Sequence, residues 1–144
     1  MREIKFRAKM VDFDGWAHGH YVNCRYNYKP EAGHFIIRSD KQYEIYPGTL
    51  GQYTGLKDID GIEIYEGDIV RMSGDYKPGV YSVIWDDYRS AWWLKNIKAG
   101  TRKREMDDDY CQLLGNCWQE VCREVIGNVF GNPELLGKRG AVAE

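Results

Sequence analysis

Aromatic rings and positive charges are concentrated in one stretch of this sequence. The combination is typical of proteins that bind single-stranded nucleic acids, because bases stack on the rings while phosphates pair with Lys and Arg. If this stretch binds a nucleic acid, the candidate contacts are two tryptophans and the basic residues that follow them. These residues are Trp92, Trp93, Lys95, Lys98, Arg102, Lys103 and Arg104.

The same stretch has an ordinary structural explanation, which we favour. Neighbouring residues of a strand point to opposite faces, so either Trp92 or Trp93 must face the core. The basic residues are followed by Glu105 and by the acidic residues 107–109. A segment with balanced charges is typical of a solvated surface. We therefore expect residues 95–109 to form an exposed loop.

His18, His20 and Cys24 are the clearest candidates for a metal site. On a strand the two histidines would project from one face and could bind zinc. No second pair of ligands stands at a matching spacing, because the other cysteines are too far apart along the chain for a typical zinc pair. These cysteines are Cys111, Cys117 and Cys122. We expect exposed histidines, reduced cysteines that pack as small apolar side chains, and no metal or other cofactor.

Asp58, Asp60 and Gly61 bear a faint similarity to a calcium-binding loop. That loop requires a bidentate Glu at its last position, where this sequence has Gly67. Turn formation explains the two aspartates without a metal. The sequence contains no phosphate-binding glycine-rich loop, nucleophile elbow or paired metal-binding motif. We expect no catalytic residues and no enzymatic activity.

The composition describes one ordinary domain. The chain has 144 residues and a formal net charge of −2. A chain of this length can bury roughly 70% of the surface that it exposes when unfolded, so one hydrophobic core stabilises it without disulfides or metals. The weak net charge argues against a protein that mainly coats duplex nucleic acid. Because we see no signal peptide and no stretch of about 20 apolar residues, we expect a cytoplasmic protein that does not bind membranes.

Alternation of polar and apolar residues predicts a mainly β protein. In residues 2–8, Ile4, Phe6 and Ala8 share one face and the charged residues share the other. One strand about every ten residues is the spacing of a small barrel or sandwich. Further strand candidates are residues 16–26, 34–38, 51–56, 62–65, 69–72, 80–85 and 91–94.

The C-terminal part of the chain carries weaker signals. An acidic cap at residues 108–109 predicts a short helix that ends at Leu114. Residues 120–130 fit a helix or a strand, and their β-branched residues and internal glycine favour the strand. Asn132 and Pro133 predict a final short helix at residues 134–136.

Three blocks of sequence carry a family pattern. Residues 2–8 read REIKFRA, residues 52–70 contain QYTGLKD and GIEIYEGDIV, and residues 124–136 read EVIGNVFGNPELL. Together the blocks resemble the YopX family of phage and prophage proteins. They span almost the whole chain, and the middle block is the most specific. Residues 9–50 and 86–118 depart from the pattern, so we expect the features specific to this protein there.

The resemblance implies a fold more than an activity. It implies a small, strongly bent β barrel, SH3-like or sandwich-like, with an N-terminal β extension involved in self-association and one or two short helices. It supplies no catalytic residues. We expect the extension at residues 1–48, the barrel core at 49–136 and a flexible tail at 137–144.

Three glycines in the middle block have a structural explanation. Gly55, Gly61 and Gly67 fall six residues apart, each where a tightly curled meander needs a turn or a bulge. We expect Gly61 or Gly67 to have a positive φ. On this interpretation the family blocks encode a fold rather than a site.

The leading functional hypothesis is a non-catalytic binding or assembly module encoded by a phage or prophage. We expect it to form a homo-oligomer and to bind a phage or host protein. The N-terminal strand at residues 3–8 lacks proline, so it can pair within the chain or with another copy. The alternative is a single-stranded nucleic-acid-binding protein that uses the aromatic and basic stretch, and an enzyme is the third hypothesis.

Overall fold

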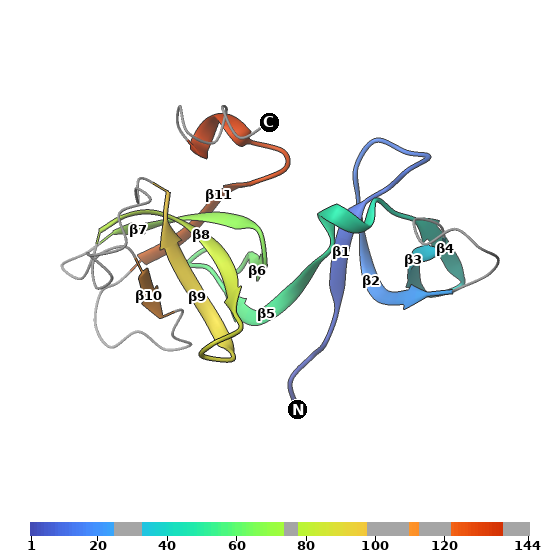
Figure 1. The fold of residues 1–144 in the computed structure, drawn as a ribbon, viewed down its shortest axis with the longest axis horizontal. Coiled ribbons are helices and arrows are strands. Elements are labelled where there is room, and N and C mark those ends of the chain that lie inside the picture. The colour runs from blue at the N-terminus through green and yellow to red at the C-terminus, as the bar shows by residue number, and fades with distance from the viewer. Residues whose placement is uncertain (25–32, 74–77, 98–109, 113–121, 137–144) are drawn as a thin grey trace. The chain divides into compact units, whose positions relative to one another are not determined.

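A computed structural model describes residues 1–24, 33–73, 78–97, 110–112 and 122–136 (Figure 1). These residues form antiparallel strands and two short 3-10 helices, so the prediction of a mainly β protein is confirmed. The chain divides into two units, Met1–Gly55 and Leu56–Glu144, which we call the N-terminal and C-terminal units. The assignment of separate roles to residues 1–48 and 49–136 stays a prediction.

The N-terminal unit is built on a meander of consecutive antiparallel strands. Its strands are β1 (Phe6–Lys9), β2 (Trp16–Asn23), β3 (His34–Arg38), β4 (Lys41–Glu44) and β5 (Gly51–Lys57), and the 3-10 helix η1 (Pro47–Thr49) precedes β5. Each of β1 to β3 pairs with the strand that follows it. The first residues of β5 pair with β1. The last residues of β5 belong to the C-terminal unit, and β6 (Glu63–Tyr65) follows β5 in the strand order.

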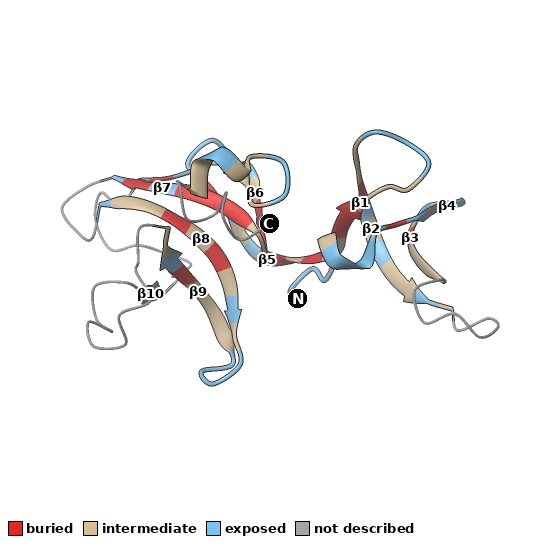
Figure 2. Cartoon of the chain, turned by 45° about the horizontal axis from the view of Figure 1, so that its top comes forward, coloured by how far each residue is buried: buried red, intermediate tan, exposed pale blue. Residues whose placement is uncertain are grey.

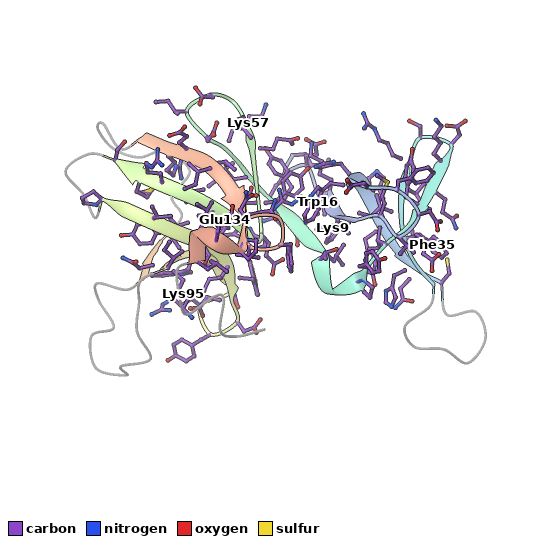
Figure 3. The ribbon with its side chains drawn as sticks, turned by 90° about the horizontal axis from the view of Figure 1, so that it is seen from above. Lys9, Trp16, Phe35, Lys57, Lys95 and Glu134 are labelled. Atoms are coloured by element: carbon purple, nitrogen blue, oxygen red, sulfur yellow. The ribbon has the colours of Figure 1, made fainter. Side chains whose placement is uncertain are left out.

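Small apolar residues form the core of the N-terminal unit. Ala8 and Ala17 lie opposite each other on β1 and β2 and are buried together with Ile36 and Ile45. Alternation along the strands places these side chains on one face of the sheet. On the other face Lys9 lies opposite Trp16 (Figure 3).

The meander of the N-terminal unit curls back on itself. Met10, just after β1, forms an isolated antiparallel bridge with Ile45, just after β4. Next to this bridge the Tyr46 amide donates a hydrogen bond of 3.0 Å to the Lys9 carbonyl. These contacts cover part of the β4 edge, which would otherwise expose unpaired backbone groups.

β1 is an interior strand. Phe6 and Arg7 pair with β2 on one side and with β5 on the other, and the Tyr53 amide donates to the Lys5 carbonyl at 2.8 Å. Of the two pairings that we expected for residues 3–8, the pairing within the chain is therefore the one observed.

The C-terminal unit contains a five-stranded antiparallel sheet with the order β10-β9-β8-β7-β11. Its core consists of buried apolar side chains from β6 to β9, which Figure 2 shows as red segments on β7, β8 and β9. These core residues are Ile64, Val70, Met72, Tyr81, Val83 and Leu94. The sheet strands are β7 (Asp68–Ser73), β8 (Gly79–Asp86), β9 (Ala91–Asn96), β10 (Tyr110–Gln112) and β11 (Cys122–Asn128), and the 3-10 helix η2 (Pro133–Leu136) follows them.

The predicted barrel is not confirmed. The strand pairing gives two antiparallel sheets, and β10 and β11 stand at opposite ends of the second strand order. Within the described residues no pairing between these two end strands closes the sheet.

Several predictions for the C-terminal part can now be assessed. The ambiguous segment at 120–130 contains the strand β11, and η2 confirms the final short helix. The helix predicted up to Leu114 is wrong at Tyr110–Gln112, which form β10 because their backbone groups pair with β9. The predicted loop is wrong at residues 95–96, which belong to β9. The remainder of the loop, from residue 98, and the tail at 137–144 lie outside the described residues.

The glycine turns are confirmed. Gly55, Gly61 and Gly67 have φ values of 87°, 80° and 88°, a region that side chains other than glycine rarely adopt. Gly67 also joins two strands through its backbone, since its amide donates to the Val83 carbonyl and its carbonyl accepts from the Val129 amide.

Asp58 joins the second family block to the third. One carboxylate oxygen accepts hydrogen bonds from the amides of Asp60 (2.8 Å) and Ile62 (2.9 Å) within the turn. The other oxygen accepts a bond of 3.0 Å from the amide of Val125 in β11. Burial alone would raise the pKa of Asp58, but these three donors together hold it below its usual value. The turn is therefore locked internally and attached to the outer edge of β11.

Candidate functional site

The β8–β9 hairpin carries the densest group of aromatic side chains that we singled out from the sequence. Trp85 pairs with Trp92 across the hairpin, and Val83 pairs with Leu94. Because residues alternate between faces, Trp85 and Trp92 lie on the same face as the buried Val83 and Leu94. Trp92 packs against the core, whereas Trp85 lies nearer the end of the hairpin, where its exposure rises to 42%.

The two tryptophans support each other. Their ring centroids are 4.9 Å apart with an interplanar angle of 73°, an edge-to-face arrangement. Such pairs stabilise a protein by about 0.5–1.5 kcal/mol beyond the area that they bury. The exposed ring of Trp85 is therefore held in place by a neighbour that is itself anchored in the core.

The loop of the hairpin, residues 87–90, is fixed by Asp86 and Arg89. The Arg89 amide donates to Asp86 Oδ1 at 3.0 Å, and the Arg89 guanidinium donates to Asp86 Oδ2 at 2.6 Å. The backbone hydrogen bond from Arg89 is the main cause that holds the pKa of Asp86 below its usual value, assisted by the guanidinium. Ser90 completes the turn with a φ of 51°. Both ends of the loop are thus tied together by one side-chain pair.

Tyr88 lies within this fixed loop and is almost completely exposed, at 96%. Figure 2 shows the whole loop between β8 and β9 in the colour of exposed residues. An exposed ring on a structured loop loses less conformational entropy on binding than a ring on an ordering segment. Trp85, Asp87, Tyr88 and Arg89 define the surface that we call the hairpin tip.

Of the predicted nucleic-acid contacts, the structure describes Trp92, Trp93 and Lys95, and these three do not share one face of β9. Trp92 packs against the core. Trp93 lies on the opposite face of β9, where the Arg89 guanidinium covers its ring at 4.2 Å from the centroid. Lys95, labelled in Figure 3, is exposed on the same strand face as Trp93. The other four predicted contacts lie outside the described residues, namely Lys98, Arg102, Lys103 and Arg104.

The importance of Asp86, Asp87 and Arg89 escaped the sequence analysis. An aspartate that opens a short polar segment between two strands is a turn signal, and the segment Asp86 to Ser90 carries it. That signal marks a turn between the predicted strands at 80–85 and 91–94, but it does not reveal the contact of Arg89 with Trp93, which depends on the strand register.

The candidate metal ligands do not converge on one point. His18 and His20 are exposed on one face of β2, as the alternation predicted. Within the described part of the chain no three His, Cys, Asp or Glu side chains are close enough to hold a metal ion. Of the cysteines, only Cys24 is described with its side chain, and it is free.

In the described segments no helix has the length and apolar character needed to cross a membrane.

Comparisons with known proteins agree with this architecture. The chain is similar to the crystal structure of protein EF1440 from Enterococcus faecalis. The similarity covers 94% of this chain and 99% of EF1440, with a TM-score of 0.53 and 22% sequence identity. At this identity the likeness concerns the fold alone. None of the curated proteins compared with the chain matches it. The family described as YopX protein matches residues 5–137. Because the match covers most of the sequence, the chain belongs to the YopX family.

Proposed function

We propose that this protein is a non-catalytic binding module, encoded by a phage or prophage and acting in the cytoplasm of the bacterial host. Its partner is a phage or host protein, and we expect the module to act as a homo-oligomer. The observation that carries the proposal is the hairpin tip, where Tyr88 is 96% exposed on a loop fixed by the Asp86–Arg89 pair. Tyr and Trp are enriched at protein interfaces because one rigid ring contributes a large contact area.

The family blocks support a division between fold and function. Asp58 and Gly67 are engaged in backbone contacts that hold the C-terminal unit together. The hairpin loop lies within residues 86–118, which contain none of the three blocks that carry the resemblance. Exposed loops on a stable scaffold are the usual place for binding residues. We therefore assign binding to the hairpin tip and stability to the shared blocks.

Single-stranded nucleic-acid binding is the second candidate function, because Trp85 and Tyr88 have exposed rings. Two features make it the weaker candidate. The Trp93 ring is covered by Arg89, and Trp92 is packed against the core, so neither tryptophan offers an open ring face comparable to Tyr88. The tip itself carries Asp87, whose exposed carboxylate repels phosphates.

Capture from a lysate of the host bacterium compares the wild type with Tyr88→Ala. Tyr46→Ala is the matched control, since Tyr46 is 51% exposed in the other unit. We expect a phage or host protein to be retained by the wild type and by the control, and lost from Tyr88→Ala. Identical captured proteins for all three would refute the role of the hairpin tip.

Labelled single-stranded oligonucleotides separate the two candidate functions. Binding that falls steeply between low and high salt would favour the nucleic-acid function, because each released counterion adds to the salt dependence. We expect no such binding by the wild type.

A further inference from the structure

The two aspartates at the end of the β8–β9 hairpin differ in their ion pairing with the described residues. Asp86 and Arg89 form an ion pair at 2.6 Å and neutralise each other. Asp87 is exposed, and none of the described residues forms an ion pair or hydrogen bond with its carboxylate. Among the described residues, Asp87 therefore presents a negative charge without an ion-pair partner, next in sequence to the exposed Tyr88.

The same loop already shows how a cation can use a ring and a carboxylate together. The Arg89 guanidinium lies 4.2 Å from the centroid of Trp93 and at the same time donates to Asp86. A planar guanidinium suits both contacts, because its face stacks on the ring while its N–H groups in the plane reach the carboxylate. Asp87 and Tyr88, which are consecutive in the loop, supply a second carboxylate and a second ring, and both residues are exposed.

We propose that the hairpin tip binds an arginine-bearing segment of a partner protein, whose guanidinium stacks on Tyr88 and pairs with Asp87. This inference rests on the proposed function, since it names the chemistry of the partner at the same surface. Charge complementarity selects a cationic segment over an acidic one. Trp85, which is 42% exposed near the same end of the hairpin, extends the apolar area available to the stem of the arginine or to its neighbours.

Arginine fits the tip better than lysine. An ammonium group is a compact, strongly hydrated charge that cannot stack as a plane. Cation–π contacts at exposed sites and exposed ion pairs are each weak. We therefore expect the arginine to contribute roughly a tenfold gain in affinity over an uncharged residue of similar length.

Selection from a display library of random peptides tests the proposal with full-length protein. Peptides that bind the wild type and Tyr46→Ala but not Tyr88→Ala are scored as dependent on the tip. We expect these peptides to be enriched in arginine. In a selected peptide, replacing that arginine by lysine should weaken binding several-fold and replacing it by glutamine about tenfold.

Asp87→Asn separates the charge from the ring, with Asp60→Asn as the matched control at another exposed turn. We expect Asp87→Asn to remove most of the preference for arginine over glutamine, while Asp60→Asn leaves it unchanged. Circular dichroism verifies that each variant keeps its β structure.

The possible outcomes distinguish this inference from the proposed function. Tip-dependent peptides that are acidic or purely apolar would overturn the arginine proposal and leave the tip as a binding surface. A library that yields no tip-dependent peptide would overturn both. Tip-dependent peptides that keep the same preference for arginine over glutamine in Asp87→Asn would show that Asp87 does not pair with the arginine. That result would refute the proposal in this form.

Discussion

Removal of the Asp58 carboxylate is the sharpest test of how this fold is held together. Asp58 is buried, with only 7% of the residue exposed. It accepts three backbone hydrogen bonds, two within its own turn and one from β11. Asp58→Ala deletes both acceptor oxygens, and with them all three hydrogen bonds, while leaving the backbone free to keep its conformation.

The expected loss follows from these contacts. A hydrogen bond to a charged acceptor contributes about 1.5–3 kcal/mol to stability. Water can reach the amides of the exposed turn, so the bonds from Asp60 and Ile62 cost less to lose than the bond from Val125. Because bonds to one carboxylate are not additive, we expect a total loss of about 3–4 kcal/mol. For a unit of this size that lowers the melting temperature by roughly 12–32 °C.

Two further variants test whether the loss of stability comes from the Asp58 carboxylate and its hydrogen bonds. Asp60→Ala removes a carboxylate from the same turn whose side chain is exposed, and it should change the free energy of unfolding by less than about 0.5 kcal/mol. Asp58→Asn keeps one oxygen for the turn but places an amide donor near the Val125 amide. This variant should lower the free energy of unfolding by about 1–2 kcal/mol. Urea unfolding followed by tryptophan fluorescence measures all three. Equal destabilisation by Asp58→Ala and Asp60→Ala would refute the reasoning.

The pH dependence of folding stability independently tests the contribution of Asp58. The folded-state pKa of Asp58 is lower than its value of about 3.9 in an unfolded chain. The unfolded state therefore binds the proton more readily, and stability from Asp58 is present above the unfolded pKa and is lost as the pH falls through the folded pKa. We expect wild-type stability to fall more steeply below about pH 4 than that of Asp58→Asn. Parallel curves would show that Asp58 does not contribute in this way.

Three other predictions follow from the fold and the sequence. Gly61→Val and Gly67→Val should each cost more than about 1 kcal/mol through backbone strain at positive φ. A Cβ at Gly67 would meet the Phe130 ring at an ordinary contact distance and a Cβ at Gly61 would meet nothing, so the Cβ itself adds no clash at either position; a loss well below this value in both variants would contradict the strain. Light scattering at tens of micromolar should give a mass above that of a monomer, and a monomeric mass would contradict self-association. The melting temperature should stay nearly unchanged when four basic residues are replaced by serine, and a loss of several degrees would make their segment part of the core; these residues are Lys98, Arg102, Lys103 and Arg104.

Much of the fold was predictable because many strands and turns are indicated by short, local patterns in this sequence. The short run of Phe35, Ile36 and Ile37 made residues 34–38 a strand candidate, and β3 has those bounds. Positive φ at Gly61 and Gly67 was predictable from turns between alternating segments. The YopX blocks were recognisable because their residues serve these turns and strands.

Strands that depend on a partner were not predictable. β4 has the sequence KQYE, which is mostly exposed and lacks an apolar alternation. It forms because its backbone pairs with β3 after a turn in which Ser39 has a φ of 56°. β10 was expected to be helical, since a capping signal is local whereas the pairing with β9 is not.

The candidate site shows the same division. The sequence by itself determined that Trp92 and Trp93 point to opposite faces, because that follows from the strand period. Only the tertiary structure decided which of them packs on the core, since the choice depends on the register that places Trp92 opposite Trp85. Likewise, the turn at Asp58 was visible locally, but its bond to Val125 joins residues 67 positions apart. Side-chain alternation is a property of a single strand, whereas register and long-range hydrogen bonds exist only once the strands have met.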